Sequence, residues 1–94
     1  MPKAVWNNIV IAESDKVEVV EGNYYFPRES VKTAYLKESD HHTTCPWKGL
    51  AHYYHVVVDD KINENAGWYY PDPKPAANQI KNHIAFWKGI EIKK

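Results

Sequence analysis

The run Leu50–Asp59 is the feature of the sequence that most restricts how the chain can fold. It is rich in β-branched and aromatic residues, which favour strands, and its centre is continuously apolar or aromatic. A run of this kind is typical of a strand that is buried on both faces. The chain is therefore expected to build a sheet with residues 50–59 as a central strand.

Paired turn residues in the first quarter of the chain predict two β-hairpins. Asn7-Asn8 and Gly22-Asn23 both suit tight turns, and residues with strand composition lie on either side of each pair. Similar short runs recur along the chain, separated by turn residues. The expected strands are Ala4–Trp6, Ile9–Ala12, Val17–Glu21, Asn23–Phe26, Thr33–Glu38, Leu50–Asp59, Trp68–Tyr70, Ile84–Trp87 and Ile90–Ile92.

Other segments interrupt the strand pattern. Proline at its start predicts one helical turn in Pro27–Val31, and a short helix is expected over Ala76–Asn82. Polar residues predict loops over Ser39–Pro46 and Asp59–Gly67. The length fits one domain over residues 1–94. The pattern predicts a mainly β fold, a sandwich or partly open barrel with one or two short helices.

The charge balance excludes several classes of partner. Twelve basic and twelve acidic residues give no net charge, so we expect no nucleic-acid partner and no anionic membrane surface. No apolar run approaches the ~20 residues of a membrane span, and the N-terminus shows no secretory signal. Cys45 is alone and cannot form an internal disulfide. We expect a cytoplasmic protein, monomeric or homodimeric, with a reduced thiol.

Cys45 is the first candidate for chemistry. His41, His42 and Lys48 lie within a few residues of it, and nearby cations stabilise a thiolate. The thiol is therefore a candidate nucleophile or redox-sensitive group. The alternative is a small buried apolar residue at the base of a loop.

Lys48, Gly49 and Arg28 are candidates for ligand binding. Gly49 allows a turn or a close backbone approach to a ligand, and Lys48 suits an anionic group. Arg28 suits bidentate binding of a carboxylate or phosphate. Each has a structural alternative: a turn glycine beside a solvated lysine, and a surface ion pair of Arg28 with Glu29. The sequence contains no P-loop and no dinucleotide-binding glycine motif, and no cofactor is predicted.

The histidines do not have the spacing of a metal site. On a strand, His52 and His55 point to opposite faces, and no C-x-x-C or H-x-x-x-H pattern occurs. No metal is therefore predicted. The same alternation places one of Tyr53 and Tyr54 beside His52 and the other beside His55. Such a Tyr–His pair could act as a general acid and base. The alternative is that both tyrosines pack in the core with their hydroxyls hydrogen-bonded.

The order of several motifs resembles that of a known bacterial family. The run T-C-P-x-K-G-x-A-x-Y starts at Thr44, and Tyr25-Phe26-Pro27 precedes it. Gly67-Trp68-x-Tyr70-Pro71-x-Pro73 follows. This arrangement is similar to domain of unknown function 427, a family that also carries a nucleotidyltransferase-like label.

The resemblance implies a β-tent, in which two antiparallel sheets lean together. It also implies a likeness in shape to zinc-binding domains such as methionine sulfoxide reductase B. The zinc does not carry over, because this chain lacks the four cysteines of such a site. The transferase activity is not supported either. The chain has no Gly-Ser pair, and its Asp59-Asp60 carboxylates are adjacent rather than spaced.

Two functions remain open from the sequence. The first is a binding protein whose aromatic-lined pocket takes a small polar or anionic ligand. The second is an enzyme that uses Cys45 as nucleophile or a Tyr–His pair drawn from His52 and Tyr53. The candidate ligand-binding residues are Tyr25, Arg28, Thr44, Cys45, Lys48, Gly49, Tyr53, Trp68 and Tyr70.

A geometric prediction accompanies these functions. Cys45, Lys48 and Tyr53 are expected to share one partly open pocket with Trp68 or Tyr70. Strand alternation allows Lys48 to join Tyr53 only if Gly49 permits a bulge. Otherwise Lys48 lies with Tyr54 or His52.

Overall fold

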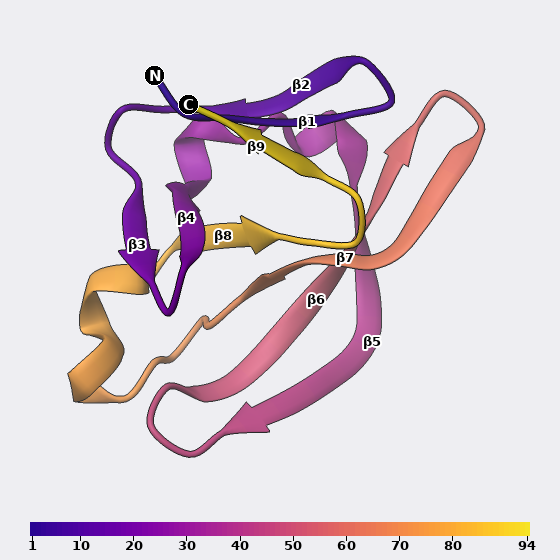
Figure 1. The fold of residues 1–94 in the computed structure, drawn as a ribbon. Helices are drawn as coiled ribbons and strands as arrows, with labels where there is room; N and C mark the ends of the chain where they lie inside the picture. The colour runs from indigo at the N-terminus through magenta and orange to yellow at the C-terminus, as the bar shows by residue number, and fades with distance from the viewer.

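The computed structural model describes residues 1–94 and consists of two antiparallel β-sheets that lean against each other (Figure 1). The smaller sheet has the strand order β2-β1-β9, and the larger has the order β3-β4-β8-β7-β6-β5. This confirms the mainly β fold of two packed antiparallel sheets. The strands are β1 (Lys3–Trp6), β2 (Ile9–Glu13), β3 (Glu18–Val20), β4 (Asn23–Pro27), β5 (Leu36–Cys45), β6 (Gly49–Val58), β7 (Lys61–Tyr69), β8 (His83–Phe86) and β9 (Glu91–Lys93).

The two hairpins predicted from turn residues are present. Asn7 and Asn8 both have positive φ and join β1 to β2. The turn between β3 and β4 is Glu21-Gly22, one residue earlier than the predicted Gly22-Asn23, and both of its residues have positive φ. The last strand, β9, returns to pair with β1, so both chain ends lie on the smaller sheet (Figure 1).

The inner strand β6 is buried on opposite faces along its two halves. Ala51 and Tyr53 are buried on one face, whereas Tyr54, Val56 and Val58 are buried on the other. The burial changes sides between Tyr53 and Tyr54, and a register shift relative to β7 follows between Tyr54 and Val56. The expected central strand is therefore correct, and its two faces contribute to two different cores.

The first core lies between the two sheets, and the second lies on the other side of the larger sheet. The first contains Phe26 and Phe86, whose rings lie 6.0 Å apart. The second is covered by η3 (Pro75–Ile80), through Ala77 and Ile80. This second core forms the base of the candidate site.

Two predicted loops are wrong, because both are strands. Most of Ser39–Pro46 belongs to β5, and most of Asp59–Gly67 belongs to β7, with Asp59 and Asp60 forming the turn between β6 and β7. β5 lies at the edge of the larger sheet and is largely exposed on both faces. A polar composition is compatible with such a strand, so polarity did not distinguish it from a loop.

The helical segments are all short 3₁₀ turns. η1 (Arg28–Ser30) and η3 fall where helices were expected. η2 (Thr33–Tyr35) occupies the start of the run Thr33–Glu38, which was predicted as a strand, so β5 begins only at Leu36. None of these helices has the length and apolar character needed to cross a membrane.

Candidate functional site

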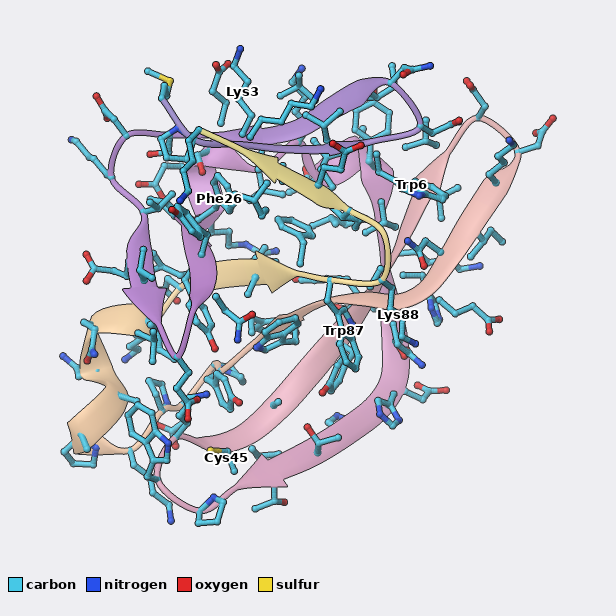
Figure 2. All side chains as sticks on the ribbon, in the orientation of Figure 1. Lys3, Trp6, Phe26, Cys45, Trp87 and Lys88 are labelled. Carbon is cyan, nitrogen blue, oxygen red and sulfur yellow. The ribbon has the colours of Figure 1, made fainter.

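An aromatic cavity of about 260 Å³ opens on the side of the larger sheet that carries the second core. Three of its aromatic side chains come from β6, from β7 and from the residue after β7. The fourth, Trp87, follows the end of β8 and points toward the β6–β7 pair (Figure 2). The lining residues are Asn23, Lys48, Tyr53, Trp68, Tyr70 and Trp87. The structure thus brings together Lys48, Tyr53, Trp68 and Tyr70, but not Cys45, which was predicted to share the pocket with them.

Lys48 lies with Tyr53, rather than with His52 or Tyr54, without the bulge that was expected at Gly49. Lys48 belongs to the β5–β6 turn, where strand alternation does not apply, and the pairing of β5 with β6 is regular from Gly49 to His52. Gly49 ends this turn. Its φ of +115° is a conformation that side-chain-bearing residues rarely adopt, and it directs the chain out of the β5–β6 turn. The turn is also anchored to the segment before η3. The Lys74 backbone N–H donates to the Lys48 carbonyl at 2.9 Å, and Lys74 Nζ donates to the Pro46 carbonyl at 2.6 Å.

Lys48 is a buried cation with one carboxylate partner. Only 6% of the residue is exposed, and its ammonium pairs with Glu21 at the tip of the β3–β4 hairpin. Its Nζ also lies 5.2 Å and 5.8 Å from the ring centroids of Trp47 and Tyr70. Burial acts to lower the pKa of Lys48, but the Glu21 hydrogen bond and the attraction of Tyr25 and Tyr70 raise it overall. The ammonium therefore stays charged.

The tyrosines of the site differ in how their hydroxyls are used. The Tyr53 hydroxyl is hydrogen-bonded to Thr43 Oγ1 at 2.9 Å. Tyr25 was predicted to bind the ligand, but it is fully buried beneath the site and does not line the cavity; its hydroxyl accepts from Trp68 Nε1 at 3.2 Å. Tyr70 is only 5% exposed, and its hydroxyl makes no hydrogen bond within the protein. No fully buried side-chain N or O lacks a partner, so the Tyr70 hydroxyl must retain access to the cavity. Tyr70 therefore offers an unused donor.

The raised pKa of Tyr70 predicts that the protein loses stability at alkaline pH. Burial raises the pKa of Tyr70 to about 12, against the opposing charge of Lys48. Because the folded protein holds this proton more tightly than the unfolded chain does, its stabilising effect is complete below pH 10.0 and is lost toward about 12. Thermal melts should show the wild type losing stability more steeply than Tyr70→Phe over this range. Parallel pH profiles of the two proteins would contradict the assignment.

Thr44 lies outside the cavity, contrary to the prediction. Its side chain is exposed, and the neighbouring Thr43 is the residue that bonds to Tyr53. The error follows from the assignment of this segment as a loop. Because it is part of β5, adjacent threonines point to opposite faces, and only one of them can reach Tyr53.

Arg28 also lies apart from the aromatic cavity. Its guanidinium donates to the Tyr54 hydroxyl at 2.7 Å, and both residues line a separate cavity. Tyr53 and Tyr54 are consecutive on β6 and point to opposite sides of the sheet. The predicted single pocket is therefore divided, with Arg28 on the other side.

Cys45 is half-buried and packs beside the second core, close to the β5–β6 turn (Figure 2). It pairs with Gly49 across the hairpin but is not among the residues that line the cavity. None of the hydrogen bonds of the structure joins its thiol to a histidine. The geometry therefore supplies no base for a Cys45 nucleophile.

The histidines have other tyrosine neighbours than those predicted, which were Tyr53 and Tyr54 for His52 and His55. The His52 ring lies 5.6 Å from that of Tyr69 and 4.4 Å from that of His42, whereas Tyr53 has His41 as its neighbour at 4.7 Å. These are ring contacts without Tyr–His hydrogen bonds. No cluster of three or more His, Cys, Asp or Glu side chains is arranged to hold a metal ion.

Three residues of the site were not predicted. Asn23 and Glu21 come from the β3–β4 hairpin, and Trp87 follows the end of β8. In the sequence, Asn23 indicated only a turn, and Trp87 indicated only the end of a strand. Their places in the site depend on packing between distant segments, for which the sequence carries no local signal.

The fold and the cavity define a small β domain of two leaning antiparallel sheets with an aromatic cavity on one side. The model of the family described as Domain of unknown function (DUF427) matches residues 2–93. The chain therefore belongs to this family, as its motifs indicated. A search of curated proteins found no match. Since the family description gives no activity, the function has to be inferred from the site.

Proposed function

We propose that this protein binds a small molecule in the aromatic cavity, and that the ligand combines a flat apolar part with a carbonyl or carboxylate group. The observation that carries the proposal is donor capacity left over on two buried side chains of one aromatic cavity. The Lys48 ammonium has one partner, Glu21, and the Tyr70 hydroxyl has none. Lys48 and Tyr70 are 6% and 5% exposed, and both line the cavity. Buried polar groups are normally hydrogen-bonded, so these two favour an acceptor from outside the chain.

The hydrogen-bond donors and the aromatic walls of the cavity together indicate the kind of ligand that fits. An ammonium has three N–H donors, and the Lys48 ammonium forms one ion pair, with Glu21. The Tyr70 hydroxyl is free to donate beside it. The indole rings of Trp68 and Trp87 lie 5.7 Å apart in an edge-to-face arrangement. A cavity of about 260 Å³ with such walls suits a ligand with a single ring.

The charges in the site indicate which classes of ligand should bind more tightly. The charge of Lys48 disfavours a cationic ligand, whereas Glu21 already offsets that charge for an incoming anion. A neutral amide bonds to the free donors without disturbing the Glu21 pair. A carboxylate gains more from Lys48 but competes with Glu21 for it. Both acceptor classes are therefore expected to bind better than an amine.

Isothermal titration with benzoate, benzamide and benzylamine tests this proposal. We expect saturable binding of benzoate and benzamide, and no binding of benzylamine. Lys48→Met should weaken benzoate binding about tenfold or more, since a hydrogen bond to a charged group contributes roughly 1.5–3 kcal/mol. Tyr70→Phe should weaken the binding of both benzoate and benzamide by a factor of about 3–10.

Two controls make the titration specific. Lys61→Met removes an exposed lysine at the start of β7, beside the end of β6 that is far from Lys48, and should leave both affinities unchanged. Glu21→Gln keeps an acceptor for Lys48 but removes the competing charge, so it should strengthen benzoate binding and leave benzamide binding unchanged. If neither acceptor ligand binds, or if Tyr70→Phe and Lys48→Met bind like the wild type, the proposed function is wrong.

A further inference from the structure

The β6–β7 pair carries a second aromatic wall on its opposite face. Tyr53 and Trp68 face the aromatic cavity, whereas the next residue on each strand, Tyr54 and Tyr69, faces the other way. The rings of Tyr54 and Tyr69 are stacked, with centroids 4.8 Å apart and an interplanar angle of 20°. They form one wall of an arginine cavity of about 290 Å³, whose lining includes Arg28, Glu38, Tyr54, Tyr69, Pro71 and Ile84.

Arg28 is held in this cavity by two bonds. Its backbone N–H donates to the Asn82 carbonyl at 2.8 Å, and its guanidinium donates to the Tyr54 hydroxyl at 2.7 Å. Tyr54 is only 4% exposed, so the hydroxyl that positions the guanidinium is fixed in the core. A guanidinium has five N–H donors, and no carboxylate of the chain forms a salt bridge with this one. A donor edge of Arg28 therefore remains for a ligand.

Glu38 places a negative charge in the same cavity. It is the direct cross-strand partner of Tyr54, so the two side chains share a face of the sheet. Glu38 and Arg28 both line the cavity without pairing with each other. The arginine cavity thus presents one cationic and one anionic group beside an apolar, aromatic wall.

We infer that the arginine cavity is a second binding site, and that it takes a free α-amino acid with an aromatic or apolar side chain. The α-carboxylate binds the open edge of the Arg28 guanidinium, where two parallel hydrogen bonds form. The α-ammonium is paired with Glu38, and the side chain lies against Tyr69, Pro71 and Ile84. A simple carboxylate satisfies only Arg28, and Glu38 opposes a dianion. The inference does not depend on the function proposed for the aromatic cavity.

Titration with three matched probes tests the inference, followed by amide correlation spectra of the full chain. The probes are L-phenylalanine, phenylacetate, which lacks the ammonium, and phenethylamine, which lacks the carboxylate. Phenylacetate is an aromatic carboxylate and also fits the aromatic cavity, so affinities for the arginine cavity are taken from the amide signals of its own residues. Measured on these signals, phenylalanine should bind about tenfold more tightly than either fragment, because only phenylalanine satisfies both charges. Its largest shifts should fall on residues 28, 38, 69 and 82.

Three variants separate the contributions. Arg28→Gln should weaken phenylalanine binding about tenfold or more. Glu38→Gln, at an exposed position, should weaken phenylalanine binding but not phenylacetate binding. Tyr70→Phe, in the aromatic cavity, should leave phenylalanine binding unchanged, so the two sites can fail independently. The inference is wrong if phenylalanine does not bind, or if it binds Glu38→Gln as tightly as it binds the wild type. It is also wrong if phenylalanine shifts the signals of aromatic-cavity residues alone.

Discussion

Replacing Phe26 by alanine should lower the free energy of unfolding by about 3–5 kcal/mol. Phe26 lies on β4, is 0% exposed, and packs against Phe86 in the core between the two sheets. It is one of the largest fully buried side chains of the protein. Its removal both loses apolar burial and leaves a cavity that rigid β-sheets close only in part.

Urea denaturation monitored by circular dichroism measures this effect. Val19→Ala provides the matched control, because Val19 lies on the neighbouring strand β3 and is 56% exposed. The control should change the free energy of unfolding by less than about 0.5 kcal/mol. Equal denaturation midpoints for Phe26→Ala and Val19→Ala would contradict the assignment of Phe26 to the core.

Gly49→Val is expected to lower the free energy of unfolding by about 2–5 kcal/mol, through backbone strain and overpacking together. The φ of Gly49 is +115°, outside the small left-handed region near 50–70° that other residues can enter. An added Cβ would already be in van der Waals contact with the Asp72 carbonyl at 3.4 Å and the Lys74 nitrogen at 3.7 Å, so the two methyl groups of valine would have to fit into what space remains around these atoms. These are backbone atoms, which cannot move away without loosening the β5–β6 turn.

Gly22→Val is the comparison that isolates the steric effect. Gly22 also has a positive φ, +79°, but a Cβ added there would meet no atom within 4 Å. It should therefore show only the conformational strain, about 1–2 kcal/mol. Because Gly49 positions Lys48, Gly49→Val should also weaken benzoate binding. Thermal melts in which Gly49→Val is as stable as the wild type, or as Gly22→Val, would show that the turn is not held as described.

The parts of the fold that were predictable are those with local causes. Asn7, Asn8 and Gly22 tolerate the positive φ that their turns require, and β6 has the composition of a buried strand. The positive φ of Glu21 has no such local signal, so the second turn was placed one residue too late. β5 and the first part of β7 were missed. Edge position and exposure let β5 be as polar as a loop, so only its pairing with β6 makes it a strand.

The site was predictable to the extent that it follows from strand geometry around one glycine. Lys48 reaches Tyr53 from the β5–β6 turn, which Gly49 ends with a positive φ, and Trp68 is the cross-strand partner of Tyr53. Arg28 was placed in the same pocket because the sequence does not show which face of the sheet a distant residue will reach. The sequence likewise does not show that Trp87 reaches the site, because its position depends on the pairing of β8 with β7.

The indole N–H signals of the four tryptophans test the central claim most directly. Trp68 and Trp87 line the aromatic cavity, whereas Trp6 packs at the first core. In nitrogen–proton correlation spectra, titration with benzoate should shift the Trp68 and Trp87 indole signals along saturable curves and leave Trp6 unchanged. The same titration of Tyr70→Phe should need more ligand for the same shift. Indole signals that stay fixed, or that all drift equally without saturation, would contradict ligand binding in the cavity.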